Sequence, residues 1–133
     1  MSHVVCRPTR REAEDFYHYF AEEQADTEGQ AYYRRQRGTT VATASGQKVA
    51  RPLVNRLTRA TGKAFDGGYP GSFPLVGSPD DVAMELGQLS QTGLAGTSIA
   101  FLDYLKEIPY FVAEVLPRLE RIGLRQPAAD LPT

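Results

Sequence analysis

The fold is decided by residues 74–105, PLVGSPDDVAMELGQLSQTGLAGTSIAFLDYL, which predict a helix, a strand and the start of a second helix. Ser78 is typical of a helix N-cap, because its hydroxyl can accept a hydrogen bond from a free backbone N–H group. Pro79 suits the first turn, and the two aspartates after it face the positive end of the helix dipole. Gly93 is placed to end this helix in a left-handed conformation.

A buried strand and a final amphipathic helix are expected after this first helix. Residues 97–102 form an apolar run too short for a surface helix, which favours a strand. Apolar residues then recur at helical spacing up to Gly123, and Pro109 is expected to start the main body of that helix. Pro117 lies inside it and predicts a kink or a break. The apolar stripe consists of Ile108, Phe111, Val112, Val115, Leu116, Leu119 and Ile122.

A strand and a helix are also predicted at the start of the chain. Residues 3–6 form a short apolar run that fits a strand. Thr9, with Glu12 three residues later, makes a capping box and opens a helix that extends to about Ala25. The stripe that this helix is expected to bury consists of Ala13, Phe16, Tyr17, Phe20 and Ala21.

The chain has 133 residues, the length of one domain, and a formal net charge of −1, which indicates no class of partner. Its single cysteine, Cys6, cannot form an internal disulfide and is expected to be a packed thiol. Without a signal peptide or a long apolar span, a cytoplasmic protein outside the membrane is predicted. The predicted organisation is a strand and helix over 1–28, a basic insertion over 29–73, a helix–strand–helix unit over 74–125 and a disordered tail over 126–133.

The basic insertion is the most uneven part of the charge distribution, since residues 29–65 contain no acidic residue. Its cations are Arg34, Arg35, Arg37, Lys48, Arg51, Arg56, Arg59 and Lys63. This one-signed composition, with several glycine, threonine and serine residues, predicts a mobile segment with a short helix over 48–61. It could be simply solvated, close as a lid on an anionic ligand or, least expected, bind nucleic acid with Tyr32 and Tyr33 stacking on bases.

Three local motifs fall short of a catalytic or metal site. Ser98 resembles the nucleophile of a G-x-S-x-G elbow, but apolar residues continue past it and no histidine follows. His3 and His18 have no second ligand at metal-binding spacing, so no metal site is predicted. The glycines of residues 67–71 match no phosphate-binding pattern; they predict a turn, or the rim of a pocket where Tyr69 could stack or hydrogen-bond.

Two strands separated by helices predict parallel pairing, but two parallel strands alone do not make a stable sheet. The predicted fold class is therefore α/β, as a C-terminal fragment of a (β/α)₈ TIM barrel that holds about its last two βα units. The reactive face of a barrel lies at the carboxyl ends of its strands. This selects Arg7 to hold an anionic group, Phe101 to pack on a planar ring and Asp103 to orient a polar group. Each has a structural alternative, such as a helix cap for Asp103 and a core position for Phe101.

Two longer segments carry a family resemblance. Residues 74–125, especially LVGSPDDVA and EVLPRLERIG, resemble the C-terminal end of bacterial luciferase-like, flavin-dependent monooxygenases. The similarity is greatest to the branch with the alkanesulfonate and dimethylsulfone monooxygenases. Residues 3–20, HVVCRPTRREAEDFYHYF, are similar to the strand and helix that precede that end. The basic insertion then occupies the place of the mobile active-site loop of the family.

The resemblance implies an oxidoreductase that uses reduced FMN, delivered by a separate flavin reductase, to oxidise a small organic substrate such as an organosulfur compound. In that family the first six strands supply most of the flavin and substrate pocket, and this chain has no counterpart for them. No catalytic residue is therefore assigned, and the cofactor-binding candidates are Arg7, Tyr69, Phe101 and Asp103. The expected partner is the missing N-terminal barrel portion or another copy of the chain. The alternative is a non-catalytic remnant that self-associates or binds a partner.

Overall fold

The chain forms a small parallel sheet with helices on both faces in the computed structural model, which describes residues 1–29, 31–32, 35–36 and 73–127. The strands are β1 (Ser2–Cys6), β2 (Phe73–Gly77) and β3 (Ile99–Ala100), in the order β2-β1-β3. Both pairings of β1 are parallel, with Val4 opposite Leu75 and Ser2 opposite Ile99. The predicted α/β class and the parallel pairing of the two expected strands are confirmed.

One face of the sheet carries the main hydrophobic core. Val4 and Cys6 of β1 and Leu75 of β2 pack there against the helices that follow β2 and β3. The helices contribute Val82, Ala83, Leu89, Phe111, Val115 and Leu119 to this core. Val4, Leu75, Val82 and Val115 are fully buried, so this layer fixes how the later helices lie on the sheet.

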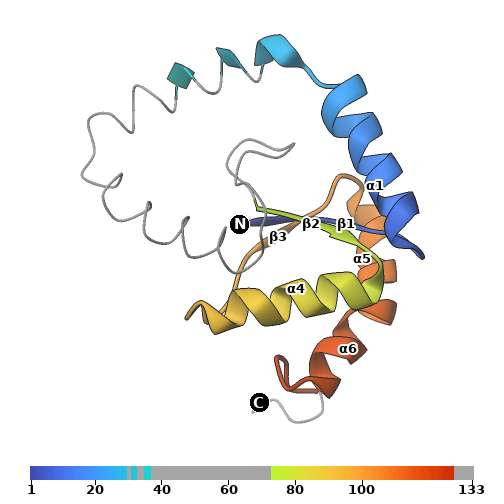
Figure 1. Cartoon of the computed structure of the whole chain (residues 1–133), viewed down its shortest axis with the longest axis vertical. Coiled ribbons are helices and arrows are strands. Elements are labelled where there is room, and N and C mark those ends of the chain that lie inside the picture. The colour runs from blue at the N-terminus through green and yellow to red at the C-terminus, as the bar shows by residue number, and fades with distance from the viewer. Residues whose placement is uncertain (30, 33–34, 37–72, 128–133) are drawn as a thin grey trace.

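The opposite face is covered by α1 (Arg10–His18) and the single-turn π-helix η1 (Tyr19–Glu23). The predicted capping box is confirmed, because the Thr9 hydroxyl accepts from Glu12 N–H and the Glu12 carboxylate accepts from Thr9 N–H. His3 on this face of β1 meets Phe20 edge to face, with ring centroids 5.4 Å apart. Figure 1 shows α1 and α4 on opposite sides of the strands.

The helix α4 (Pro79–Gln91) is capped as its sequence predicts. Ser78 accepts from Asp81 N–H, while the Asp81 carboxylate accepts from the backbone N–H and the hydroxyl of Ser78. The helix ends at Gln91 with Thr92 as its C-cap, and Gly93 follows in the left-handed region with φ 90°. The caps therefore set both ends of this helix.

The last helical segment is divided into α5 (Tyr104–Glu114) and α6 (Leu116–Arg121), which confirms the break predicted at Pro117. Pro117 is in the first turn of α6, where its missing N–H is tolerated. The position expected for Pro109 is wrong, because α5 begins at Tyr104 under an Asp103 cap and Pro109 lies inside it. Three members of the expected apolar stripe, Ile108, Val112 and Ile122, are exposed.

The strand order differs from that of consecutive barrel units, so the barrel-fragment prediction is not confirmed. Successive barrel strands are neighbours in the sheet, whereas here β1 lies between β2 and β3. With helices on both faces, this order is that of an open doubly wound sheet. β2 was not predicted, and β3 is shorter than expected, since only Ile99–Ala100 of residues 97–102 pair as a strand.

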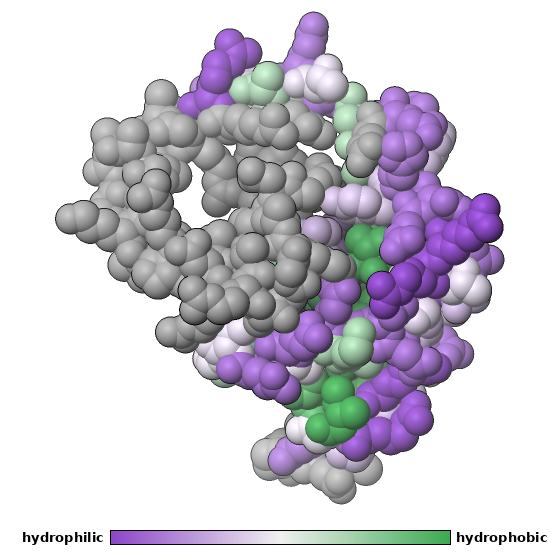
Figure 2. Space-filling model, viewed as in Figure 1, coloured by the Kyte–Doolittle hydropathy of each residue, from purple (hydrophilic) through white to green (hydrophobic). Residues whose placement is uncertain are grey.

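The predictions for the basic insertion lie almost wholly on residues 37–72, outside the part of the chain that the structure describes, as does the tail from residue 128. In the described ranges, no helix has the length and apolar character needed to cross a membrane. On the face shown in Figure 2, hydrophobic side chains gather near the lower end of the molecule, over α4 and α6. Ile122 and Leu124 lie beside Gly87 of α4.

Candidate functional site

A cavity of about 470 Å³ opens at the carboxyl edge of the sheet, beside the residues that follow β1. Its walls come from the end of β1, from α1 and from the start of α5. The lining residues are Arg7, Pro8, Phe16, Asp103, Lys106, Glu107 and Tyr110. In an open parallel sheet, ligands bind in the crevice outside the carboxyl ends of the strands where the strand order reverses. The strand order places that point between β1 and β3.

Arg7 is the cation of this cavity with the most contacts. One Nη atom donates to the Glu107 carboxylate at 2.9 Å and the other to the carbonyl oxygen of Cys6 at 2.8 Å. The guanidinium lies over the Phe16 ring, with its central carbon 4.2 Å from the ring centroid, the arrangement of a cation–π contact. The guanidinium is thus held in one orientation, and its other N–H groups make no hydrogen bond to any described residue.

Glu107 joins the ends of the two strands to α5. One carboxylate oxygen binds Arg7, and the other accepts from the backbone N–H groups of Leu102 and Asp103 at 2.9 and 3.0 Å. The side chain is only 8% exposed. A buried carboxylate requires such hydrogen bonds and a cation to offset its lost hydration. Glu107 is therefore the residue that fixes the geometry of this edge.

Asp103 and Lys106 form the outer rim of the cavity. One Asp103 oxygen caps α5 by accepting from the N–H groups of Leu105 and Lys106, and the other lies 3.2 Å from the Lys106 ammonium. The hydrogen bond from Lys106 holds the pKa of the Asp103 carboxyl below its usual value. Each cation of the lining is thus paired with a carboxylate of the lining, so the walls are polar without a net charge.

Tyr110 of α5 also lines the cavity, and Cys6 precedes Arg7 in the chain. Partial burial raises the pKa of Tyr110, with smaller contributions from Cys6 and Glu114. Burial also raises the pKa of the Cys6 thiol to about 12, so this cysteine is neutral at physiological pH. This agrees with a packed thiol, because the thiolate is the reactive form of cysteine. The site offers aromatic surface, a phenol and paired charges.

Four cofactor-binding candidates came from the sequence, and the structure brings two of them together. Arg7 and Asp103 line the same cavity, although both also have structural roles. Phe101 packs edge to face on Phe111 and Tyr104 beside the core, which is its structural alternative. Tyr69 lies outside the described residues.

Sequence reasoning missed Glu107, Tyr110 and Phe16 as members of the site. Phe16 was expected in the buried stripe of its helix, and it is half-buried beneath Arg7. The sequence contains one indication that Glu107 belongs to the site, which is that a carboxylate lies in the first turn of a helix beside apolar positions. Nothing in its spacing indicates Arg7, which is separated from it by 100 positions in the sequence.

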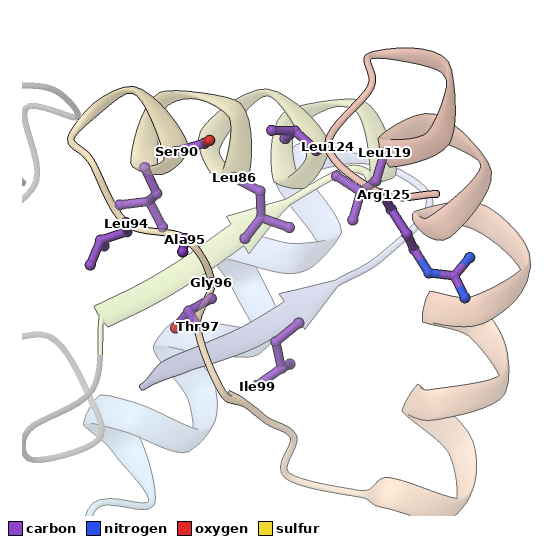
Figure 3. Close-up of a pocket in the computed structure, with 11 residues that line it drawn as sticks. Leu86, Ser90, Leu94, Ala95, Gly96, Thr97, Ile99, Leu119, Leu124 and Arg125 are labelled. Atoms are coloured by element: carbon purple, nitrogen blue, oxygen red, sulfur yellow. The ribbon is translucent and has the colours of Figure 1, made fainter. Parts of the chain in front are cut away.

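A second, apolar cavity of about 250 Å³ lies between α4, β3 and the end of α6 (Figure 3). Its apolar walls are Leu86, Leu89, Leu94, Ala95, Ile99, Leu119 and Leu124. Figure 3 shows the guanidinium of Arg125 directed away from the other lining residues, and Arg125 pairs with Glu120. This cavity thus offers apolar surface and the hydroxyl-bearing residues Ser90 and Thr97, without a charged group directed into it.

Within the described ranges, no group of three or more histidine, cysteine, aspartate or glutamate side chains is placed to hold a metal ion. No family model, curated protein or solved structure matches this chain. The family resemblance of residues 3–20 and 74–125 therefore stays a prediction.

Proposed function

We propose that this chain supplies one wall of the flavin and substrate site of a two-component, reduced-FMN-dependent monooxygenase of the luciferase-like family. The observation that supports this most is the cavity at the carboxyl edge of β1 and β3, lined by Arg7 and Asp103. These residues were selected from the sequence because barrel chemistry occurs at that edge. An open doubly wound sheet has its ligands at the same edge.

The lining fits part of an FMN molecule. Its volume lies within the range of ligand pockets, roughly 300–1,000 Å³. Phe16 and Tyr110 offer aromatic surface for a planar ring, and Asp103 offers a polar rim. The phosphate is not accommodated as well, because Arg7 and Lys106 are already paired with carboxylates. We therefore assign only the ring to this wall.

Bound reduced FMN would supply the electrons that activate oxygen, and the described residues would bind and orient the flavin ring. Tyr110 of α5 would exclude water from one side of the ring. Glu107 would hold Arg7 and the chain after β3 in fixed positions through its hydrogen bonds. The substrate we propose is a small organic molecule, with an organosulfur compound as the expectation that the resemblance gives.

A (β/α)₈ barrel, completed by further strands from a partner, is part of this proposal. β1 and β3 are parallel neighbours, as adjacent barrel strands are. β2 and α1 occupy positions that a consecutive barrel would give to other elements, so closure with further strands would require both to move. This predicts that a barrel-completing partner changes the environment of α1.

Flavin binding tests the proposal. Fluorescence of FMN is measured with the chain alone and with a polypeptide that carries the first six strands of a luciferase-like monooxygenase. We expect quenching with the mixture, and about tenfold weaker binding when Tyr110→Leu removes an aromatic wall, within the 1–3 kcal/mol typical of such stacking. Tyr19→Leu is the matched control, since Tyr19 is an exposed tyrosine outside the cavity. A mixture that neither associates nor binds flavin would overturn the proposal.

The alternative function, a non-catalytic chain that self-associates or binds a partner, is favoured by one specific observation. The solvent side of α5 exposes large apolar side chains.

A further inference from the structure

The main hydrophobic core is open at one end, where the apolar cavity between α4, β3 and α6 lies (Figure 3). Two of its wall residues, Leu89 and Leu119, belong to the core and are 4% and 8% exposed. Leu86 and Ile99, also in the walls, pack against that core and are only partly buried. A Cβ atom added at Gly96, another wall residue, would have no atom within 4 Å. The core therefore continues into open apolar space.

The size of this space limits what can fill it. Protein cores are close-packed, and voids larger than a water molecule are few. This cavity measures about 250 Å³. A smaller apolar cavity, of about 150 Å³, takes up benzene. There is thus room for one aromatic ring with a short alkyl substituent, or for an alkyl chain of similar size.

The polar groups of the lining exclude a charged occupant. The Thr97 hydroxyl is already hydrogen-bonded to the Ser2 hydroxyl at 3.0 Å. Arg125 pairs with Glu120, and its guanidinium is directed away from the other lining residues (Figure 3). A charged group placed among the leucines would lose its hydration without gaining a partner. The lining therefore favours an uncharged molecule.

We propose that the cavity between α4, β3 and α6 is a binding site for a small, uncharged, apolar molecule, of the size of an alkylbenzene. Leu86, Ile99 and Leu119 would contact it from three different elements (Figure 3). Leu124, which is 39% exposed, lies at the mouth and leaves a path for entry.

This site is separate from the proposed flavin site, and neither proposal depends on the other. Gly96 and Thr97 of the apolar cavity precede β3, whereas Arg7 of the other cavity follows β1. Because β1 and β3 are parallel, these positions lie at opposite ends of the sheet. The apolar ligand and flavin would therefore not compete.

Two probes of similar size and different charge test the site. Ethylbenzene and phenylacetate are titrated separately into the full chain, and backbone amide shifts are followed by nuclear magnetic resonance. Ethylbenzene should cause saturable shifts that are largest for residues 86–99 and 119–125. Phenylacetate should cause none there, because its carboxylate would have to be buried without a partner.

Cavity-filling variants locate the binding. Leu86→Trp fills the space from α4, and Ala95→Leu fills it from the loop before β3. Each should weaken ethylbenzene binding at least about tenfold, the lower limit for one surplus methylene in a hydrophobic pocket. Met84→Trp is the matched control, since Met84 is exposed on the same helix and lies outside the lining. Circular dichroism shows whether the variants fold; Ala95 is exposed, so its replacement leaves the core in place.

Four results would overturn the proposal. No saturable shift up to the solubility limit of ethylbenzene would show that side chains of the chain itself, and not a ligand, complete the core. Equal binding of phenylacetate would contradict the choice of an uncharged ligand. Unchanged affinity in Ala95→Leu would place the binding elsewhere, and equal weakening by Met84→Trp would remove its specificity.

Discussion

Replacing Glu107 tests whether this buried carboxylate holds the two strand ends together. Glu107→Ala removes the ion pair with Arg7 and two hydrogen bonds to backbone N–H groups, those of Leu102 and Asp103. Removing one partner of a buried ion pair costs about 3–5 kcal/mol. The Arg7 side chain is 26% exposed and can be rehydrated in part, which places the expected loss at the lower end, about 3 kcal/mol.

The conservative variant separates charge from hydrogen bonding. Glu107→Gln keeps one oxygen that can accept from the two N–H groups and loses the charge and the acceptor that binds Arg7, so we expect a loss of about 1–2 kcal/mol. Glu114→Gln is the matched control on the same helix; Glu114 is 44% exposed in its pair with Arg118, and about 0.5 kcal/mol or less is expected. The free energy of unfolding is measured by urea titration at one fixed protein concentration.

The ranking of the variants decides the outcome. The geometry requires that Glu107→Ala is the least stable variant, that Glu107→Gln is intermediate and that the control Glu114→Gln is the most stable. A loss under about 1 kcal/mol for Glu107→Ala would show that water replaces all three hydrogen bonds, and that Glu107 does not fix this edge. Equal losses in the free energy of unfolding for Glu107→Ala and Glu107→Gln would show that the whole effect comes from the ion pair with Arg7.

Three further predictions follow from single groups. The hydrogen bond from Arg10 lowers the pKa of Asp81 to about 2, so its contribution to stability is present above pH 4 and lost as the pH falls from about 4 to 2. Asp81→Asn should remove that part of an acid unfolding curve, and an unchanged curve would contradict it. The raised pKa of Cys6 gives stability that is lost as the pH rises from about 9 to 12. Cys6 should therefore react with a thiol reagent at neutral pH only at the rate of unfolding; fast labelling of the native protein would refute this. Gly123→Ala should cost about 1 kcal/mol because its φ is 74°, whereas Gly96→Ala, with open space around its added Cβ, should be neutral or slightly stabilising in the same denaturation assay.

The helix caps and helix ends were predictable from the sequence, because the interactions that form them lie within a few residues of each other. The caps at Thr9 and Ser78 and the left-handed Gly93 each depend on neighbours in the sequence, and all are confirmed. β2 was missed because Pro74 lacks an N–H donor and argues against a strand interior. It is tolerated here because β2 is an edge strand, a position that only the assembled sheet reveals.

The candidate site was predictable only where its position follows from strand direction. Arg7 and Asp103 were found because both follow parallel strands, and the carboxyl ends of such strands meet at one edge. Glu107 and Phe16 depend on contacts with Arg7 that packing creates, and the sequence carries no record of that packing. The same limit explains the apolar stripe of α5 and α6, of which the core buries Phe111, Val115 and Leu119 while Ile108, Val112 and Ile122 are exposed.

The strand order matters less for the site than for the fold. In a barrel the reactive edge lies at the carboxyl ends of all strands, and in a doubly wound sheet it lies at those ends where the order reverses. β1 and β3 satisfy both conditions, since they are parallel neighbours and the chain passes to opposite sides of β1. The part of the cavity formed by Arg7, Asp103, Glu107 and Tyr110, outside α1, therefore stays the candidate site under either architecture. What distinguishes them is whether β2 and α1 keep their places when further strands are added to the edge of β3.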